Sequence, residues 1–150
     1  MFPNLYEDQR DRDNELDARR RIQTAWNCTL HKLPGTHPID FVAMRGERLM
    51  AWIEYKKRGF VWGQYDTVII SVRKVSSLRR FAAVAGRAFF VVEDKKGEMR
   101  AAPIALDERF DAHASWGGQT ATTRDPTDVE PVVMLPLDRF RLVDASPRTH

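Results

Sequence analysis

The sequence predicts an α/β domain in which a mixed β-sheet carries helices. Two observations support this fold class: two segments place apolar residues at helical spacing, and several short β-rich segments lie between and after them. The expected element order is α-β-β-β-α-β-β, which is typical of an α/β domain. With 150 residues, of which 43% are hydrophobic, the chain is long enough for one domain with a substantial core.

The first helix is predicted over residues 12–26, where one face at 3.6-residue spacing contains Ala18, Ile22, Ala25 and Trp26. Three short segments rich in β-forming residues follow, and turn residues separate them. This pattern predicts a three-stranded antiparallel meander. Its strands are expected at CTLHKL (28–33), IDFVAMR (39–45) and LMAWIEYKK (49–57).

The second helix is predicted to begin near Ser71 and to end at Gly86, because glycine favours the left-handed conformation that follows many helices. Its buried stripe is expected to contain Val75, Leu78, Ala82 and Ala85. The residues just before this helix have the composition of a strand or of a loop that leads into the helix.

The rest of the chain is expected to complete the sheet. Residues 88–94 (AFFVVED) are the clearest buried strand, and residues 99–104 (MRAAPI) return as its hairpin partner. Residues 107–131 are rich in Gly, Thr, Asp and Pro, which predicts a long loop. Residues 131–143 supply a last strand and an edge segment, so the core of the single domain is expected at about residues 12–105.

The charge distribution favours a surface that binds polyanions. Residues 51–100 carry eleven basic and five acidic groups, whereas residues 1–50 balance and residues 101–150 have a net charge of −3. A positive middle between neutral and acidic ends is typical of a nucleic-acid-binding face. A solvated basic face would have a similar composition.

Composition also bears on the compartment. The longest apolar runs are far shorter than the roughly 20 residues that a membrane helix needs, so no membrane partner is expected. The N-terminal residues are polar where a signal peptide is apolar. The single cysteine, Cys28, suits a reducing environment, and these features together predict a cytoplasmic protein.

The segment LMAWIEYKK carries charges inside a run that is expected to be buried. Alternation along a strand places Trp52, Glu54 and Lys56 on one side and Ile53 and Tyr55 on the other. Both sides begin apolar, which indicates a central strand covered on each face. A buried carboxylate costs several kcal/mol unless it is paired or binds a metal. Two interpretations follow: an ion pair at the end of a strand, or a metal site.

Two further carboxylates favour the metal site. Antiparallel pairing in which the two residue numbers add up to 94 would place Asp40 opposite Glu54, and it requires an odd-numbered connection such as residues 46–48. Glu15 lies on the apolar face of the first helix, where it could supply a third carboxylate. Carboxylates that hold a hard cation, with a lysine beside them and a basic surface around them, are typical of phosphodiester hydrolases.

These residues resemble the D…(D/E)xK motif of the PD-(D/E)xK nuclease superfamily. Asp40 is followed after thirteen residues by Glu54-Tyr55-Lys56, and a helix with Glu15 precedes them, as in the compact Holliday-junction resolvases and phage nucleases of that group. The proline of the motif departs from the pattern, because Ile39 separates it from Asp40. The resemblance covers residues 12–94 and implies a single restriction-endonuclease-like domain with an α-β-β-β-α-β core.

The resemblance also implies roles for individual residues. Asp40, Glu54, Lys56 and Glu15 would be catalytic; Mg²⁺, for which Mn²⁺ would substitute, would bind Asp40, Glu54, the carbonyl of Tyr55, and Glu15. The partner would be DNA, and the substrate would be either branched or junction DNA or plain duplex. Resolvases of this group are dimers, which leaves a homodimer open for this chain. The residues expected to contact nucleic acid are Lys57, Arg58, Arg73, Lys74 and Arg80.

Two alternatives remain at this point. The chain could be a non-catalytic nucleic-acid-binding protein on the same fold, or a structural or regulatory protein in which Glu54 and Lys56 form only an ion pair. Trp62 and Tyr65, which lie between basic segments, could stack on bases or sugars, although Trp62 suits core packing equally well.

Overall fold

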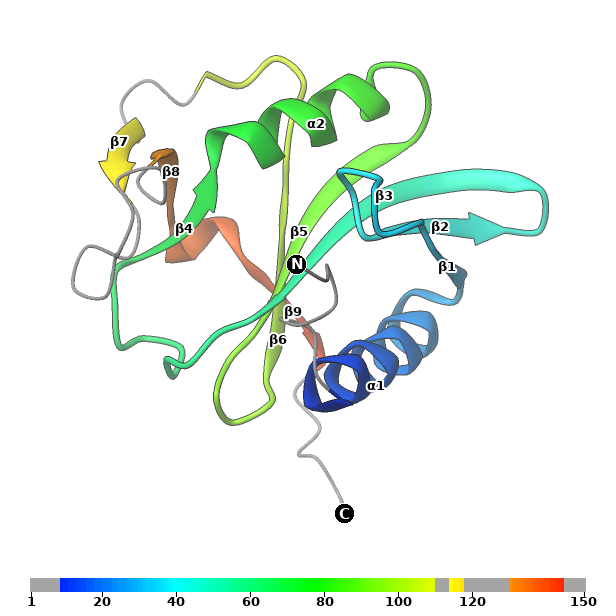
Figure 1. Ribbon diagram of the computed structural model, residues 1–150, viewed down its shortest axis with the longest axis horizontal. Coiled ribbons are helices and arrows are strands. Elements are labelled where there is room, and N and C mark those ends of the chain that lie inside the picture. The colour runs from blue at the N-terminus through cyan, green and yellow to red at the C-terminus, as the bar shows by residue number, and fades with distance from the viewer. Residues whose placement is uncertain (1–8, 110–113, 118–129, 145–150) are drawn as a thin grey trace, which may run out of the picture.

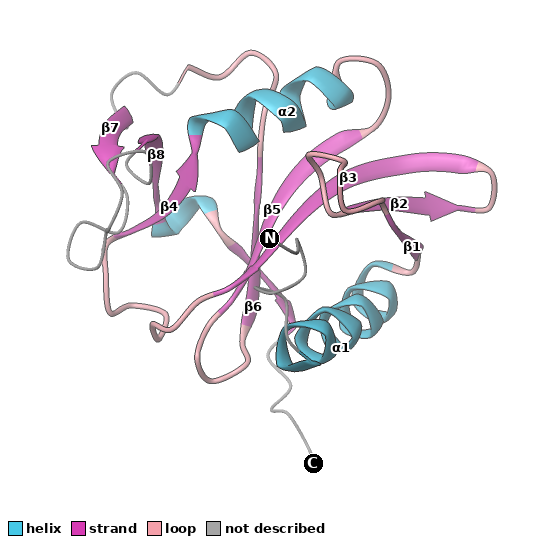
Figure 2. Cartoon of the chain, viewed as in Figure 1, coloured by secondary structure: helices cyan, strands magenta, loops and turns pink. Residues whose placement is uncertain are grey.

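The computed structural model describes residues 9–109, 114–117 and 130–144 of the chain. Its elements alternate in the way that the sequence predicted, with additional strands in the C-terminal third (Figures 1 and 2). In chain order they are α1 (Gln9–Trp26), β1 (Thr29–Lys32), β2 (Phe41–Arg45), β3 (Arg48–Lys57), β4 (Thr67–Ser71), α2 (Val72–Ala82), β5 (Arg87–Glu93), β6 (Met99–Pro103), β7 (Ala114–Gly117), β8 (Glu130–Pro136), the 3-10 helix η4 (Leu137–Arg139) and β9 (Arg141–Asp144).

A mixed six-stranded sheet forms the centre of the molecule. Its strand order is β1-β2-β3-β5-β6-β9, in which β3 and β5 run parallel and every other pair is antiparallel. The parallel pair needs a crossover, and β4 with α2 supplies it. The predicted α/β fold with a mixed sheet is therefore confirmed, and β3 is the central strand that the apolar start of both its faces indicated.

The two faces of this sheet are covered differently. Helix α1 packs on one face through Ala18 and Ile22, against Phe41, Ile53 and residues of β5 and β6. Helix α2 covers the other face, as Figure 1 shows, together with a second sheet of order β4-β8-β7. Since apolar clusters form on both faces, Glu54 near the carboxyl end of the central strand is buried, whereas Lys56 at the next position on the same face is exposed.

The second sheet was not predicted. The stretch before α2, expected as a strand or a loop, is the strand β4 and pairs with β8. Strand β7 lies inside residues 107–131, which were predicted to be one long loop, and it pairs with β8 as well. The remainder of that segment, beyond residues 107–109 and the start of β8, falls outside the described residues. The expected strand and edge segment at residues 131–143 correspond to β8 and β9.

The register between β2 and β3 is the one that the sequence required, but the chain reaches it differently. Phe41 pairs with Ile53 and Ala43 with Ala51, so the paired numbers add up to 94. The turn, however, contains two residues, Gly46 and Glu47, rather than an odd number. An irregularity at Met50 then adds one residue to β3 and restores the predicted alignment. A β-bulge therefore places the carboxylates on one face.

Gly86 determines how closely the chain leaving α2 approaches β3. Its φ angle is +74°, and a Cβ atom at this position would lie 2.6 Å from Leu49 Cδ2 and 3.1 Å from the Met50 carbonyl oxygen. Helix α2 itself ends earlier than predicted, at Ala82, so Ala85 lies beyond the helix and is exposed rather than part of its buried stripe. Ser71 caps the first turn by accepting a hydrogen bond from the Lys74 N–H at 3.1 Å.

We expect Gly86→Ala to lower the free energy of unfolding by about 2 kcal/mol, because it combines a left-handed backbone with a steric clash. For a chain of this length, the melting temperature should fall by about 4–8 °C in a thermal scan. Gly35→Ala is the matched control, since Gly35 has neither a positive φ nor an atom within 4 Å of an added Cβ. Equal melting temperatures for both variants would contradict the prediction.

Among the residues that the structure describes, no helix is long and apolar enough to cross a membrane.

Candidate active site

The start of β2 and the carboxyl-terminal half of β3 bring Asp40 and Glu54 together. Asp40 immediately precedes β2, and its backbone carbonyl accepts a hydrogen bond from Leu33 N–H at 2.9 Å. Its side-chain Oδ2 accepts a second bond from the Tyr55 N–H, also at 2.9 Å. The Asp40 carboxylate is thereby fixed against the backbone of β3, next to Glu54.

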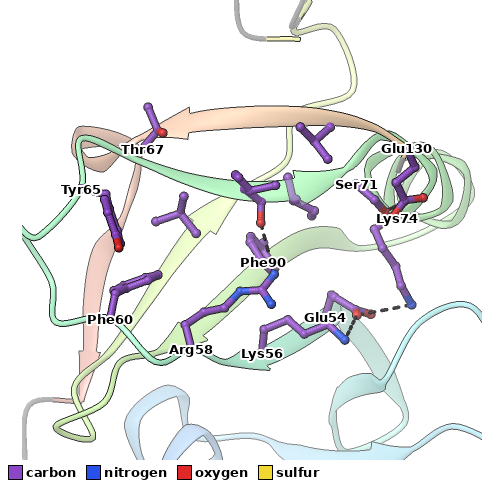
Figure 3. A pocket seen from close by; sticks show the side chains of 14 residues that line it. Glu54, Lys56, Arg58, Phe60, Tyr65, Thr67, Ser71, Lys74, Phe90 and Glu130 are labelled. Carbon is purple, nitrogen blue, oxygen red and sulfur yellow. Dashed lines mark hydrogen bonds and ion pairs between the residues drawn. The ribbon is translucent and has the colours of Figure 1, made fainter. Parts of the chain in front are cut away.

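Glu54 is a buried carboxylate whose close partners are two lysines. Its side chain is 1% exposed, and among the described residues none gives its oxygens a well-aligned hydrogen bond. Two lysines form ion pairs with Oε2: Lys74 Nζ lies at 3.3 Å and Lys56 Nζ at 3.8 Å (Figure 3). A buried, unsatisfied carboxylate is costly, so this arrangement indicates a functional position rather than a stabilising one.

The surroundings of Glu54 change its proton affinity. Burial raises the pKa of its carboxyl from 4.5 to about 7, and the negative charge of Asp40 contributes in the same direction. Lys74 and Lys56 oppose this shift but do not cancel it. The raised pKa of Glu54 therefore comes first from burial and second from the neighbouring carboxylate of Asp40.

The donor set fits a hard divalent cation. Mg²⁺ and Mn²⁺ prefer carboxylate and carbonyl oxygens and retain water, and one or two carboxylates suffice for a Mg²⁺ site. Asp40, Glu54 and the carbonyl of Tyr55 are the groups at this position that could hold such an ion. Within the described ranges, no three His, Cys, Asp or Glu side chains gather as a metal-binding group.

Glu15 reaches the same side of the molecule but contacts a lysine first. Lys32 Nζ, from β1, lies 2.5 Å from Glu15 Oε1 and 4.0 Å from Asp40 Oδ1. Glu15, which is on α1, is therefore connected to Asp40 through Lys32, and the structure does not join all three carboxylates at one point. Lys32 was not among the expected site residues, because its position depends on the register between β1 and β2 across an irregular loop.

The five residues expected to contact nucleic acid do not form one surface. Lys74 lies at the carboxylates, where it also donates a 2.6 Å hydrogen bond to the Pro38 carbonyl. Arg58 lines the pocket beside them. Arg73 and Arg80 are exposed on α2, and the Arg80 guanidinium lies 5.4 Å from the centre of the Phe81 ring.

Lys57 faces the opposite side of the sheet. Its Nζ is 3.1 Å from Glu93 Oε2 and donates a 2.9 Å hydrogen bond to the Asp94 carbonyl. Glu93 is fully buried and also accepts hydrogen bonds from the Tyr55 hydroxyl at 2.7 Å and from Arg21 at 3.2 Å. Lys57 thus takes part in a buried ionic network that ties α1 to β3 and β5. The alternation of side chains along a strand could have predicted that Lys57 lies away from the candidate site, since neighbouring residues such as Lys56 and Lys57 point to opposite faces.

A pocket of about 580 Å³ opens from Glu54 along the neighbouring strand β4. It lies between the carboxyl end of β3, the following residues up to Tyr65, and strands β4 and β8 (Figure 3). The side chains that line it include Glu54, Lys56, Arg58, Phe60, Tyr65 and Lys74. Glu54, Lys56 and Lys74 therefore lie at one end of a cavity and not on a flat surface.

Comparison with known proteins identifies a family and agrees with the fold. Residues 1–143 match the sequence model of a family described as "Phage putative PDDEXK endonuclease". Among solved structures, the chain is similar to Hjc, a Holliday junction resolvase from the archaeal hyperthermophile Archaeoglobus fulgidus, at 22% sequence identity and a TM-score of 0.51. That match covers 65% of this chain and 75% of the other, and it confirms the restriction-endonuclease-like fold. A comparison with curated proteins found no match.

Proposed function

This chain belongs to the phage PD-(D/E)xK endonuclease family, and we propose that it is a metal-dependent endonuclease that hydrolyses phosphodiester bonds in DNA. The observation that carries the proposal is Glu54: a buried carboxylate that lies beside Asp40, has a raised pKa and is paired with two lysines. A simple pair between Glu54 and Lys56 would not account for Asp40, whose negative charge raises the pKa of Glu54 further.

Each group has a role in this proposal. Asp40 and Glu54, with the carbonyl of Tyr55, would hold Mg²⁺, for which Mn²⁺ would substitute. When bound, the ion would polarise the scissile phosphate and lower the pKa of a water molecule. Glu15 would act on the site indirectly, by holding Lys32 next to Asp40. The similarity to Hjc supports branched or junction DNA as the substrate, and a homodimer would place two sites on a symmetric junction.

The two lysines at Glu54 would have different roles. Lys74 is anchored by the Pro38 carbonyl and by Glu54, so it would balance charge and hold the carboxylate in place. Lys56 is 45% exposed, and its amine lies at the mouth of the site. Lys56 would orient the attacking water and offset the charge that develops on the phosphate.

Incubation of the protein with labelled DNAs tests the proposal. The panel would contain linear duplex, nicked, flap and four-way junction DNA, each with Mg²⁺, with Mn²⁺ and with EDTA. We expect cleavage with either metal and none with EDTA. A protein that binds DNA but cuts no member of the panel with either ion would favour the non-catalytic alternative.

We expect Lys56→Ala to reduce the cleavage rate by at least about a hundredfold, because it removes a charge positioned at the transition state. DNA binding should weaken by only a few fold, since one phosphate contact of several is lost. Lys96→Ala is the control: Lys96 is an exposed lysine in the turn between β5 and β6. Single-turnover rates and gel-shift titrations measure the two effects. Equal cleavage rates for the two variants would remove Lys56 from the mechanism.

A further inference from the structure

The pocket continues beyond the candidate catalytic groups to an aromatic end. We use that name for Phe60 and Tyr65, which lie on the segment between β3 and β4. Figure 3 shows Glu54 near one end of the pocket, these two rings at the other, and Arg58 between them. The proposed hydrolysis requires no aromatic side chain, so Phe60 and Tyr65 have no role in it.

The aromatic end is open to solvent, and contacts with neighbouring residues hold its two rings in place. Tyr65 is 59% exposed, and its ring lies at 90° to that of Phe60, with 6.3 Å between ring centres. Phe60 is half-buried, contacts the Trp62 ring at 5.3 Å, and its carbonyl accepts a 2.7 Å hydrogen bond from the Lys95 N–H. Ile69, which also lines the pocket, is 45% exposed. Exposed apolar surface inside a pocket is typical of a binding site.

Arg58 connects the two ends. Its side chain is half-buried, and one N–H donates a 3.3 Å hydrogen bond to the Ile69 carbonyl. Arg58 and Glu54 line the same pocket; burial lowers the pKa of Arg58, and the charge of Glu54 acts in the opposite direction. A guanidinium carries five N–H donors, so it can hold a phosphate while it retains the bond to Ile69.

We propose that this pocket is a nucleotide subsite that takes one unpaired nucleotide next to the scissile phosphate. The base would stack on Tyr65 and Phe60, and Arg58 would bind the phosphate between that base and the carboxylates. The proposal rests on the proposed nuclease function for the place of the scissile phosphate. The volume of about 580 Å³ is in the range of small-ligand pockets.

The consequence is selectivity for DNA structure rather than for sequence. Stacking on an aromatic ring accepts any base, because every base has a π face. A paired base must first be extruded from the duplex, which is least costly where the base is already unpaired. The subsite would therefore favour single strands, flaps or mispaired positions over fully paired duplex.

Binding measurements without divalent ions test this inference independently of cleavage. Fluorescence anisotropy would compare wild type, Tyr65→Ala and Tyr65→Phe on two DNAs: a duplex with one unpaired nucleotide and the same duplex fully paired. Tyr65→Ala should weaken binding to the first DNA by roughly five- to thirtyfold, and to the second by less than twofold. Tyr65→Phe keeps the ring and should match wild type on both.

A second readout places the base. A 5-iododeoxyuridine at the unpaired position should crosslink on irradiation to residues 60–65, and Tyr65→Ala should lose that crosslink. Val84→Ala is the control, because Val84 is an exposed apolar residue outside the pocket. Equal loss of affinity for both DNAs, or a crosslink elsewhere in the chain, would overturn the subsite. A protein that shows the subsite but never cuts DNA would contradict only the nuclease proposal.

Discussion

Asp40→Asn should abolish cleavage and leave DNA binding intact or slightly tighter. The substitution keeps the size of the side chain and retains an oxygen that can accept the Tyr55 N–H bond, so the fold around the site should persist. It removes one of the two charges that would hold the cation. We expect the cleavage rate to fall by at least roughly 10²–10³-fold, the effect of losing one preorganised charged group.

Binding should respond in the opposite direction because Asp40 repels phosphate. Removing this charge also relieves Glu54, whose pKa is raised partly by Asp40, so the Glu54 carboxyl should titrate at lower pH in the variant. Cleavage assays and gel shifts on the same preparations would measure both effects. Asp107→Asn is the matched control, since Asp107 is exposed and distant in sequence from the motif. An Asp40→Asn protein that still cuts DNA at the wild-type rate would refute the mechanism.

The features that the sequence allowed us to predict depend on local periodicity. Alternation along residues 49–57 placed Glu54 and Lys56 on one side of a central strand, and both do lie together at the pocket. The apolar pattern required one register between β2 and β3, because a slip of one residue would have moved the whole apolar set to the other face. The same pattern could not predict the turn, since a two-residue turn with a bulge gives the same alignment as an odd-numbered connection.

The features that were missed depend on contacts between segments far apart in the chain. Strands β4 and β8 pair although more than fifty residues separate them, and no local signal in either strand specifies that partner. Lys32 and Lys74 reach the carboxylates from β1 and α2, so their roles became visible only once these elements were packed. The position of Lys57, in contrast, follows from the sequence alone. Lys57 is two residues from Tyr55 along β3, so both side chains lie on the face opposite to Lys56.

Without divalent ions, Glu54→Gln should stabilise the protein at pH 8 and have little effect near pH 4.5. Glu54 has a pKa of about 7 in the folded chain and an ordinary value of 4.5 when unfolded. Between these values the folded protein keeps a proton that the unfolded chain has lost, so the free energy of unfolding decreases as pH rises. The decrease is complete above about pH 7 and absent below about pH 4.5.

The size of this effect makes it measurable. Raising a pKa from 4.5 to about 7 corresponds to roughly 3 kcal/mol, which in a chain of this length is a difference of about 6–12 °C in melting temperature. Thermal scans of wild type and Glu54→Gln from pH 4.5 to pH 8 should therefore diverge as pH rises. Glu47→Gln, at an exposed turn, should follow wild type throughout.

Divalent ions should reduce or reverse the difference in stability between wild type and Glu54→Gln. A metal ligand must be deprotonated, so bound Mg²⁺ or Mn²⁺ would offset the repulsion between Glu54 and Asp40 and stabilise the folded wild type. Glu54→Gln lacks the charge that attracts the ion and should gain little. At pH 8, millimolar Mn²⁺ should therefore raise the melting temperature of wild type towards that of the variant, or beyond it. Curves that stay parallel at every pH and metal concentration would mean that Glu54 neither holds a proton at neutral pH nor binds an ion.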